Sequence, residues 1–238
     1  MRIDRFLGNL PQANRRQARL WLATGRIRID GAVVRDATTE VGPFSDIQLD
    51  GQPLQQRRPR YFMLHKPAGY LSATEDPLHP TVLALIAADQ RHGLHIAGRL
   101  DRASTGLLLL TDDGDWSWQL TAPDKTIAKV YRVDTAHPIH PDTAARFAAG
   151  IYFPYEGITT RPVVLEQLAE RQVRLTLHEG RYHQIKRMFG RFRNPVVGLH
   201  REQVGNLRLD PDLAPGQYRP LSAAEIAGIA APTAPDRG

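Results

Sequence analysis

A loop that carries one aspartate between two arginines is the first place in this sequence where chemistry is expected. Asp101 follows Gly98 and stands between Arg99 and Arg102, shortly before four consecutive leucines at 107–110. The leucines predict a buried strand, and the polar loop before it would display the aspartate at the strand's end. Flanking guanidinium groups keep a carboxylate ionised, which suits a nucleophile or a general base. A lone aspartate in a loop is more often a turn or cap residue, so other segments must support this interpretation.

A lysine far along the chain is the second candidate. The apolar residues of its segment recur at the spacing of one helix face: Ile185, Met188, Phe189 and Phe192. We therefore expect a helix that begins near His183 and buries this stripe. Lys186 lies about 100° round the helix from Ile185 and can lean into a cleft, while Arg187 and Arg191 face solvent or a polyanion. Taken alone, the position of Lys186 is typical of a lysine whose aliphatic stem packs at the margin of a core while its ammonium reaches solvent.

Two further segments have patterns that predict strands. Residues 64–70, LHKPAGY, form an apolar run that ends at a proline and a glycine, which is typical of a strand followed by a turn. Residues 129–133, KVYRV, alternate so that 129, 131 and 133 share one face. From residue types alone, Tyr131 is a packing residue.

Residues 1 to about 52 indicate a small separate unit with a basic surface. Asn14 and Gly25 are suited to begin and end an amphipathic helix, and Asp30-Gly31 predicts a two-residue hairpin turn between two short strands. The outward arginines of the helix and the hairpin are expected to form one patch: Arg15, Arg16, Arg19, Arg26 and Arg28. The alternative is an ordinary solvated helix face.

Composition places a domain boundary after this unit. Residues 52–60, QPLQQRRPR, are polar and bracketed by prolines, as a linker is. We expect a first domain with its linker over 1–58, a second over 59–230 and a flexible tail over 231–238. The second domain mixes alternating strands with helical stretches, which indicates an α+β fold, and Ser222–Glu225 predicts a capping box on its last helix.

Composition also excludes several classes of site. The chain has 238 residues, a net charge of +6 and no cysteine, which rules out disulfides, thiol nucleophiles and cysteine-ligated metals. It has neither an export signal at its start nor an apolar stretch long enough to span a membrane, so we expect a cytoplasmic protein. Of its 31 basic residues four are lysines, which leaves 27 arginines. This favours a nucleic-acid partner, although a GC-rich genome produces the same ratio.

Together, three segments resemble the signature motifs of the pseudouridine synthases of the RsuA branch: HKPAGY, GRLDRASTGLLLLT and EGRYHQIKRMF. The resemblance reaches to about Ile229, and the first unit resembles an S4-type RNA-binding domain. Four other segments favour members that act on 16S rRNA: PRYFML, HPTV, LHRE and DLAPGQYRPL. His65 stands where the family often has asparagine, and Arg102-Ala103-Ser104 replace other polar residues, which affects site preference more than catalytic groups.

The resemblance implies an α+β fold in which a small S4-like N-terminal RNA-binding domain is linked to a pseudouridine-synthase catalytic domain with a mixed, largely antiparallel sheet. It implies isomerisation of a uridine in 16S rRNA, at uridine 516, during maturation of the small ribosomal subunit. No cofactor and no metal are expected, in agreement with the lack of phosphate-loop, dinucleotide and metal-cluster motifs.

The same resemblance assigns roles to the candidate residues. Asp101 is the essential carboxylate, as a nucleophile or as the base that gives a ribose glycal, and Lys186 is its cationic partner. Tyr131 stacks on the target base and assists removal of the proton from C5. The target base has to leave the RNA stack, and Arg99 is a candidate to fill the gap or hold the flanking phosphate.

Other arginines are expected to hold the RNA backbone. Arg181 and Arg187 would do so together with the arginines of the first unit, so that binding weakens steeply with salt. The expected partner is 16S rRNA or a small-subunit ribonucleoprotein, and the protein is expected to be a monomer.

Three alternatives remain open at this point. One is an enzyme of the same branch that modifies 23S rRNA, and another is an RNA-binding assembly factor without catalysis. Glycoside hydrolysis by paired carboxylates is disfavoured because acidic residues are sparse around Asp101.

Overall fold

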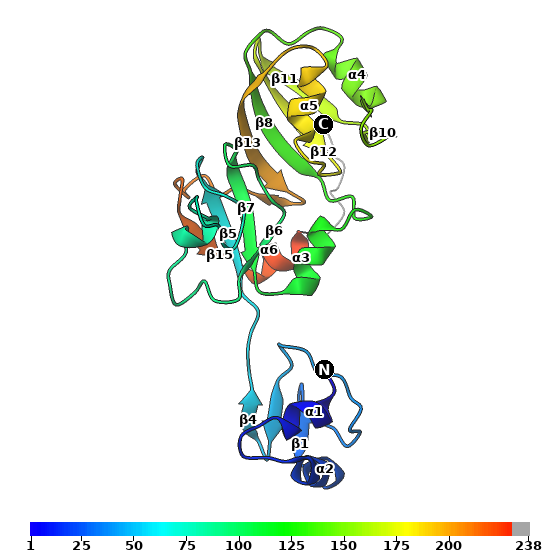
Figure 1. Cartoon of the computed structure of the whole chain (residues 1–238), viewed down its shortest axis with the longest axis vertical. Helices are drawn as coiled ribbons and strands as arrows, with labels where there is room; N and C mark the ends of the chain where they lie inside the picture. The colour runs from blue at the N-terminus through cyan, green and yellow to red at the C-terminus, as the bar shows by residue number, and fades with distance from the viewer. Residues whose placement is uncertain (230–238) are drawn as a thin grey trace. The chain divides into compact units, whose positions relative to one another are not determined.

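The computed structural model describes residues 1–229 and divides into two compact units (Figure 1). The first ends at Pro59 and the second begins at Arg60. The tail predicted at 231–238 lies outside the described residues. Within residues 1–229 no helix is long and apolar enough to cross a membrane.

The first unit packs two helices on a small antiparallel sheet. The strands follow the order β2-β1-β3-β4. The elements are α1 (Ile3–Gly8), α2 (Arg15–Ala23), β1 (Ile27–Ile29), β2 (Ala32–Val33), β3 (Ile47–Leu49) and β4 (Gln52–Gln55). The predicted helix is confirmed as α2, because the Asn14 side chain accepts from the backbone N–H groups of Arg16 and Gln17 at its start. It ends before Gly25, whose φ of 71° only glycine adopts easily.

The predicted hairpin is also confirmed. Asp30 and Gly31 have φ values of 50° and 83°, which is the geometry of the turn that matches strand twist. The turn pairs Arg28 with Val33 in β1 and β2. Arg28 is exposed between buried neighbours in β1, as the alternation predicted.

The prediction of a linker from residue 52 is wrong in its first half. Residues 52–55 form β4, which pairs with β3. Asp50 and Gly51, with φ values of 52° and 79°, form a second tight turn that brings this polar segment back onto the sheet. Pro53 is tolerated because β4 is an edge strand, whose outer side needs no hydrogen-bond donor.

The second unit is an α+β domain around a nine-stranded sheet. Its main path is β11-β12-β8-β13-β7-β5-β15, with β14 paired to β13 and β6 to β7. Within residues 60–229 the pairing of β13 with β7 is the one parallel pair among named strands, so the mixed, largely antiparallel sheet is confirmed. The strands are β5 (Tyr61–Lys66), β6 (His95–Ala97), β7 (Thr105–Thr111), β8 (Lys129–Thr135), β11 (Val164–Ala169), β12 (Gln172–Leu177), β13 (Val196–Val204), β14 (Leu207–Arg208) and β15 (Tyr218–Pro220).

Helices and a short hairpin surround this sheet. They are the 3-10 helix η1 (Val82–Leu85), α3 (Gly114–Thr121), α4 (Thr143–Ala149), the pair β9 (Tyr152–Phe153) and β10 (Ile158–Thr159), α5 (Gln184–Gly190) and α6 (Ala223–Gly228). Figure 1 shows α4 and α5 at the β11–β12 end of the sheet, and α3 and α6 together near β6. The predicted capping box of α6 is confirmed, with Ser222 and Glu225 bonded to each other's backbone.

The central strand β7 is buried as predicted. Its four leucines, 107–110, are fully buried and alternate between two hydrophobic clusters on the two faces of the sheet. At its start Gly106 has a φ of 104°, and an added Cβ would lie 2.3 Å from the backbone oxygen of Arg201 in β13. The close parallel approach of these two strands therefore requires glycine.

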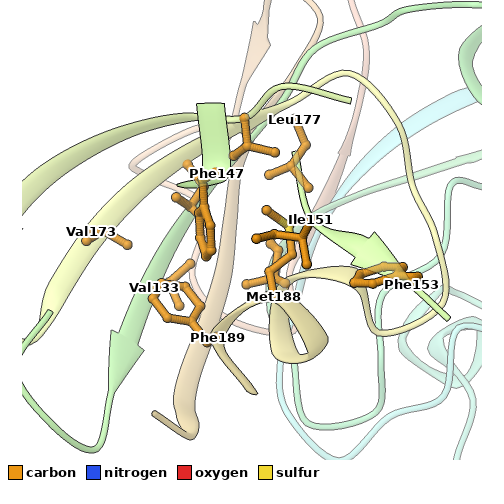
Figure 2. Close-up of a cluster of buried hydrophobic side chains, with 11 residues drawn as sticks. Val133, Phe147, Ile151, Phe153, Val173, Leu177, Met188 and Phe189 are labelled. Carbon is orange, nitrogen blue, oxygen red and sulfur yellow. The ribbon is translucent and has the colours of Figure 1, made fainter. Parts of the chain in front are cut away.

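A hydrophobic cluster fixes helix α5 against the sheet (Figure 2). Met188 and Phe189 are buried against Val133 of β8 and Val173 of β12. Each such side chain contributes about 1.5–3 kcal/mol to stability. Phe192 lies beyond the end of α5, but it packs against the same cluster, so the predicted stripe is buried although the helix is shorter than expected.

Candidate active site

Asp101 and Lys186 meet although they lie 85 positions apart in the sequence. The Lys186 ammonium Nζ donates to Asp101 Oδ2 at 2.8 Å. The side chains are 30% and 35% exposed, so the pair opens to solvent and substrate rather than being enclosed. In the free protein a partly exposed ion pair of this kind contributes little to folding stability. The pair is therefore available for a catalytic role.

The fold explains this meeting. Asp101 lies in the loop between β6 and β7, at the start of the central buried strand. Lys186 lies in the first turn of α5, whose buried stripe is fixed by the cluster of Figure 2. Two separate hydrophobic cores therefore hold the carboxylate and the ammonium.

The first sequence motif clamps the loop that carries Asp101. The Lys66 ammonium is completely buried and donates to the backbone oxygens of Pro67, Arg102 and Ser104 at 2.9, 3.2 and 2.7 Å. The backbone N–H of Gly69 also donates to the Arg102 oxygen at 2.8 Å. The three carbonyls satisfy the three donors of the ammonium, so Lys66 holds the loop without neutralising Asp101.

Burial lowers the pKa of Lys66 to about 8, although the charge of Asp101 opposes this effect. The side chain of Lys129, on the same face of β8 as Tyr131, also has a pKa lowered to about 8, by burial and by the charge of Arg201. Both lysines are therefore easier to deprotonate than an exposed lysine.

A buried arginine organises the floor of the site. Arg201 of β13 is 1% exposed and donates to the backbone oxygens of Leu107, Gly98 and Arg99 at 2.8, 2.9 and 3.4 Å. It also lies 3.5 Å from the hydroxyl oxygen of Tyr131. Within residues 1–229 no carboxylate pairs with Arg201, so its charge is satisfied by carbonyl dipoles alone.

His183 is a second side chain that faces the aspartate. Its Nε2 lies 3.4 Å from Asp101 Oδ2. His183 precedes α5 and adopts the left-handed conformation, with a φ of 49°, which is unusual for a residue with a side chain. Strained backbone of this kind often occurs at functional sites.

Three cavities that share lining residues surround these side chains. A cavity of about 110 Å³, which we call the inner cavity, is lined by residues that include Asp101, Tyr131, Leu177, Ile185, Lys186 and Leu199. A cavity of about 700 Å³, which we call the outer cavity, is lined by residues that include Arg99, Asp101, Lys129, Tyr131, Tyr182 and Arg201. A side cavity of about 390 Å³ includes Lys129, Glu156, Arg161, Arg181 and Tyr182. The outer cavity has the size of a typical small-molecule pocket, with Asp101 at its junction with the inner one.

The cavities bring together the three predicted catalytic residues, Asp101, Tyr131 and Lys186. Of the predicted RNA-binding arginines, Arg99 and Arg181 line the inner and outer cavities. Arg181 is paired with Glu179 at 3.0 Å.

Arg187 is arranged differently from the expectation that it faces away from the protein. Its guanidinium donates to Glu156 at 2.7 Å and lies 3.6 Å from the centre of the Phe153 ring. It lines none of the three cavities. Its role in RNA binding stays a prediction.

The predicted basic patch of the first unit is exposed. Its members on α2 are Arg15, Arg16 and Arg19, and those around β1 are Arg26 and Arg28. Arg26 is paired with Asp50, and Arg28 donates to the Gly31 oxygen at 2.9 Å. The three arginines of α2 are therefore the better placed to bind phosphate.

Residues 1–229 contain no group of three or more histidine or acidic side chains placed to hold a metal ion. Sequence reasoning missed the roles of Lys66, Arg201 and His183. Their signals were present in the HKP, LHRE and RYHQ segments, but residue types alone do not tell a buried lysine or arginine from an exposed one.

Comparisons with known proteins agree with this geometry. The RNA pseudouridylate synthase family model matches residues 60–190, and the S4 domain model matches residues 1–47. The ribosomal small subunit pseudouridine synthase A of Pseudomonas aeruginosa is 55% identical over 230 residues, which are 96% of this chain and 100% of that protein. The protein of the same name from Escherichia coli K12 is 48% identical, with the same coverage.

A solved structure is also similar. The crystal structure of a pseudouridylate synthase matches with a TM-score of 0.71 and 38% identity, covering 96% of this chain and 99% of that one. Since matches at this identity span nearly the whole chain, the chain belongs to the RNA pseudouridylate synthase family, in the RsuA branch that its three motifs resemble, and it is an isomerase.

Proposed function

We propose that this chain converts one uridine of 16S rRNA, uridine 516, to pseudouridine during maturation of the small ribosomal subunit, with Asp101 as the catalytic carboxylate. The observation that carries the proposal is the Asp101–Lys186 pair, 2.8 Å apart, at the junction of two cavities that Tyr131 also lines. The relatives named ribosomal small subunit pseudouridine synthase A support rRNA of the small subunit as the substrate. They disfavour the alternative in which the substrate is 23S rRNA.

The reaction needs an ionised carboxylate. The N1–C1′ bond of the uridine breaks, a C5–C1′ bond forms, the proton leaves C5, and N1 gains a proton, so no electrons are exchanged. Asp101 either attacks the sugar or base as a nucleophile or takes a ribose proton to give a glycal. On both routes Lys186 keeps Asp101 charged and oriented while RNA excludes water from the site.

Two other groups act on the detached uracil. Tyr131 stacks on the base and assists removal of the C5 proton. Arg201 lies 3.5 Å from the Tyr131 hydroxyl. It orients the phenol and stabilises negative charge that develops on the phenol oxygen. The inner cavity takes the base, and the outer cavity takes the rest of the nucleotide.

RNA binding is shared between the two units. Arg99 and Arg181 hold the flanking phosphates at the cavity, and the arginines of α2 hold more distant backbone. The partner is 16S rRNA or a small-subunit ribonucleoprotein, met in the cytoplasm by a monomeric protein. An RNA-binding factor without catalysis would have no use for an ion pair at the junction of two cavities.

Pseudouridine mapping of rRNA tests the proposal. A strain without the gene should lack pseudouridine at position 516, and expression of the wild-type protein should restore it. Asp101→Asn should restore nothing, whereas Asp89→Asn, which removes an exposed carboxylate elsewhere, should restore modification fully. The proposal is wrong if the deletion strain keeps this pseudouridine, or if Asp101→Asn restores it.

A further inference from the structure

Tyr182 is an exposed aromatic residue at the active-site cavity. Its side chain belongs to the third motif, yet it is 76% exposed. It lines both the outer cavity and the side cavity, so it stands between them. A large ring that the fold leaves uncovered beside a functional cavity is available for contact with a ligand.

The ring is held in place on one face only. Tyr182 stacks on His183 with ring centres 3.9 Å apart and an interplanar angle of 19°. The left-handed backbone of His183 permits this stacking of adjacent residues, and its contact with Asp101 at 3.4 Å fixes the imidazole. The Tyr182 carbonyl also accepts from Arg187 at 3.3 Å. Because His183 covers one face, the exposed area lies on the other face and the edge.

We propose that the open face of Tyr182 is a stacking platform for the nucleobase next to the target uridine. The inference rests on the proposed function. When a uridine leaves the RNA stack, its neighbour loses a stacking partner, and an aromatic side chain at the mouth of the cavity replaces it. The ligand is one unpaired base of any kind, because every base offers a π face.

The surroundings fit a nucleotide. Arg99 lines the outer cavity and Arg161 the side cavity, so each of the two cavities that Tyr182 borders holds a guanidinium that can meet a phosphate of the RNA. The side cavity also holds the carboxylates of Glu179 and Glu156, and Arg181 pairs with them at 3.0 and 3.8 Å. One aromatic ring bordered by cations suits a base with its phosphates better than an apolar protein segment.

The platform also touches the catalytic centre. Tyr182 stacks on His183, and His183 reaches Asp101. A base seated on Tyr182 therefore restrains the imidazole beside the carboxylate. For this reason we expect loss of the ring to lower kcat as well as to raise KM.

Kinetics on a small-subunit rRNA transcript test the platform with the full chain. Tyr182→Ala should lower kcat/KM for pseudouridine formation by roughly 5- to 150-fold, the effect of losing one stacked base. Tyr182→Phe and Tyr182→Trp keep a ring and should stay within about threefold of the unmodified chain. Tyr155→Ala is the matched control, since Tyr155 is 102% exposed and lines none of the three cavities. Unchanged kcat/KM in Tyr182→Ala, or an equal loss in Tyr182→Phe, overturns the inference.

A binding experiment separates this inference from the proposed function. A single-stranded RNA that carries 2-aminopurine next to a uridine should show quenched fluorescence with the unmodified chain and with Tyr182→Phe, but not with Tyr182→Ala. If the unmodified chain forms no pseudouridine in small-subunit rRNA but quenches in this pattern, the proposed function fails and the platform stands. If pseudouridine forms while Tyr182→Ala quenches as fully as the unmodified chain, the platform fails and the function stands. Thermal unfolding of Tyr182→Ala should match the unmodified chain, because the ring is exposed.

Discussion

Replacing Lys186 by methionine tests the electrostatic argument directly. At the 2.8 Å that joins Nζ to Asp101 Oδ2, the Coulomb energy is about 1.5 kcal/mol in water and about 6 kcal/mol at an effective dielectric constant of 20. The pair is about one-third exposed in the free protein, and bound RNA excludes water from it. The Coulomb energy of the pair in the transition state is therefore closer to the larger value. We expect kcat to fall by roughly 10²- to 10⁴-fold.

The same substitution should leave the folded state nearly unchanged. A partly exposed ion pair contributes about 0–1 kcal/mol, so the free energy of unfolding of Lys186→Met should stay within about 1 kcal/mol of the unmodified value. Lys186→Arg keeps the charge with altered geometry and should recover part of kcat. Arg171→Met removes an exposed cation that lines none of the three cavities and should leave kcat unchanged.

The assay is the single-turnover rate of tritium release from C5-labelled uridine in a 16S transcript, with enzyme in excess. The reasoning would be refuted if the rate of tritium release by Lys186→Met were within threefold of the rate of the wild-type protein. It would also be refuted by a loss in Arg171→Met as large as that in Lys186→Met, because the effect would then come from net charge.

Two further predictions concern the framework of the site. Because the pKa values of Lys66 and Lys129 are lowered to about 8 from an unperturbed 10.5, the folded chain binds fewer protons than the unfolded chain between these values. The free energy of unfolding should therefore rise between pH 8 and 10 in urea titrations, and Lys66→Met should flatten the rise; an unchanged slope in that variant would contradict the argument. Gly106→Ala should destabilise by roughly 3 kcal/mol or more, because its Cβ would meet the backbone of Arg201, and denaturant titration measures this loss. Gly216→Ala has a similar positive φ but open space, so it should cost about 1–2 kcal/mol; equal losses at the two glycines would remove the steric explanation.

Local signals explain what could be predicted from the sequence. The Asn14 cap and the Asp30-Gly31 turn act within a few residues, and the structure has both. The four leucines of β7 predicted a buried strand because apolar runs of that length are buried in sheets. The meeting of Asp101 with Lys186 came from a family resemblance, since no local rule joins positions 85 residues apart.

Long-range pairing explains what was missed. Residues 52–55 are too polar to predict a strand alone, and they form β4 because the turn at Asp50 and Gly51 places them beside β3. Lys66 and Arg201 are ordinary basic residues in the sequence. Their burial depends on carbonyl groups that distant loops and strands bring to them.

The way these two cations are satisfied determines the charge of the site. A carboxylate partner would cancel their charge, whereas carbonyl oxygens accept their hydrogen bonds and leave the charge in place. Lys66 and Arg201 both use carbonyls, so within residues 1–229 Asp101 faces a surplus of positive charge from Lys66, Arg201 and Lys186. Such a surplus attracts RNA phosphates and stabilises the negative charge that develops on a detached uracil. The buried cations therefore hold the loop of Asp101 and also prepare the cavity for an anionic substrate.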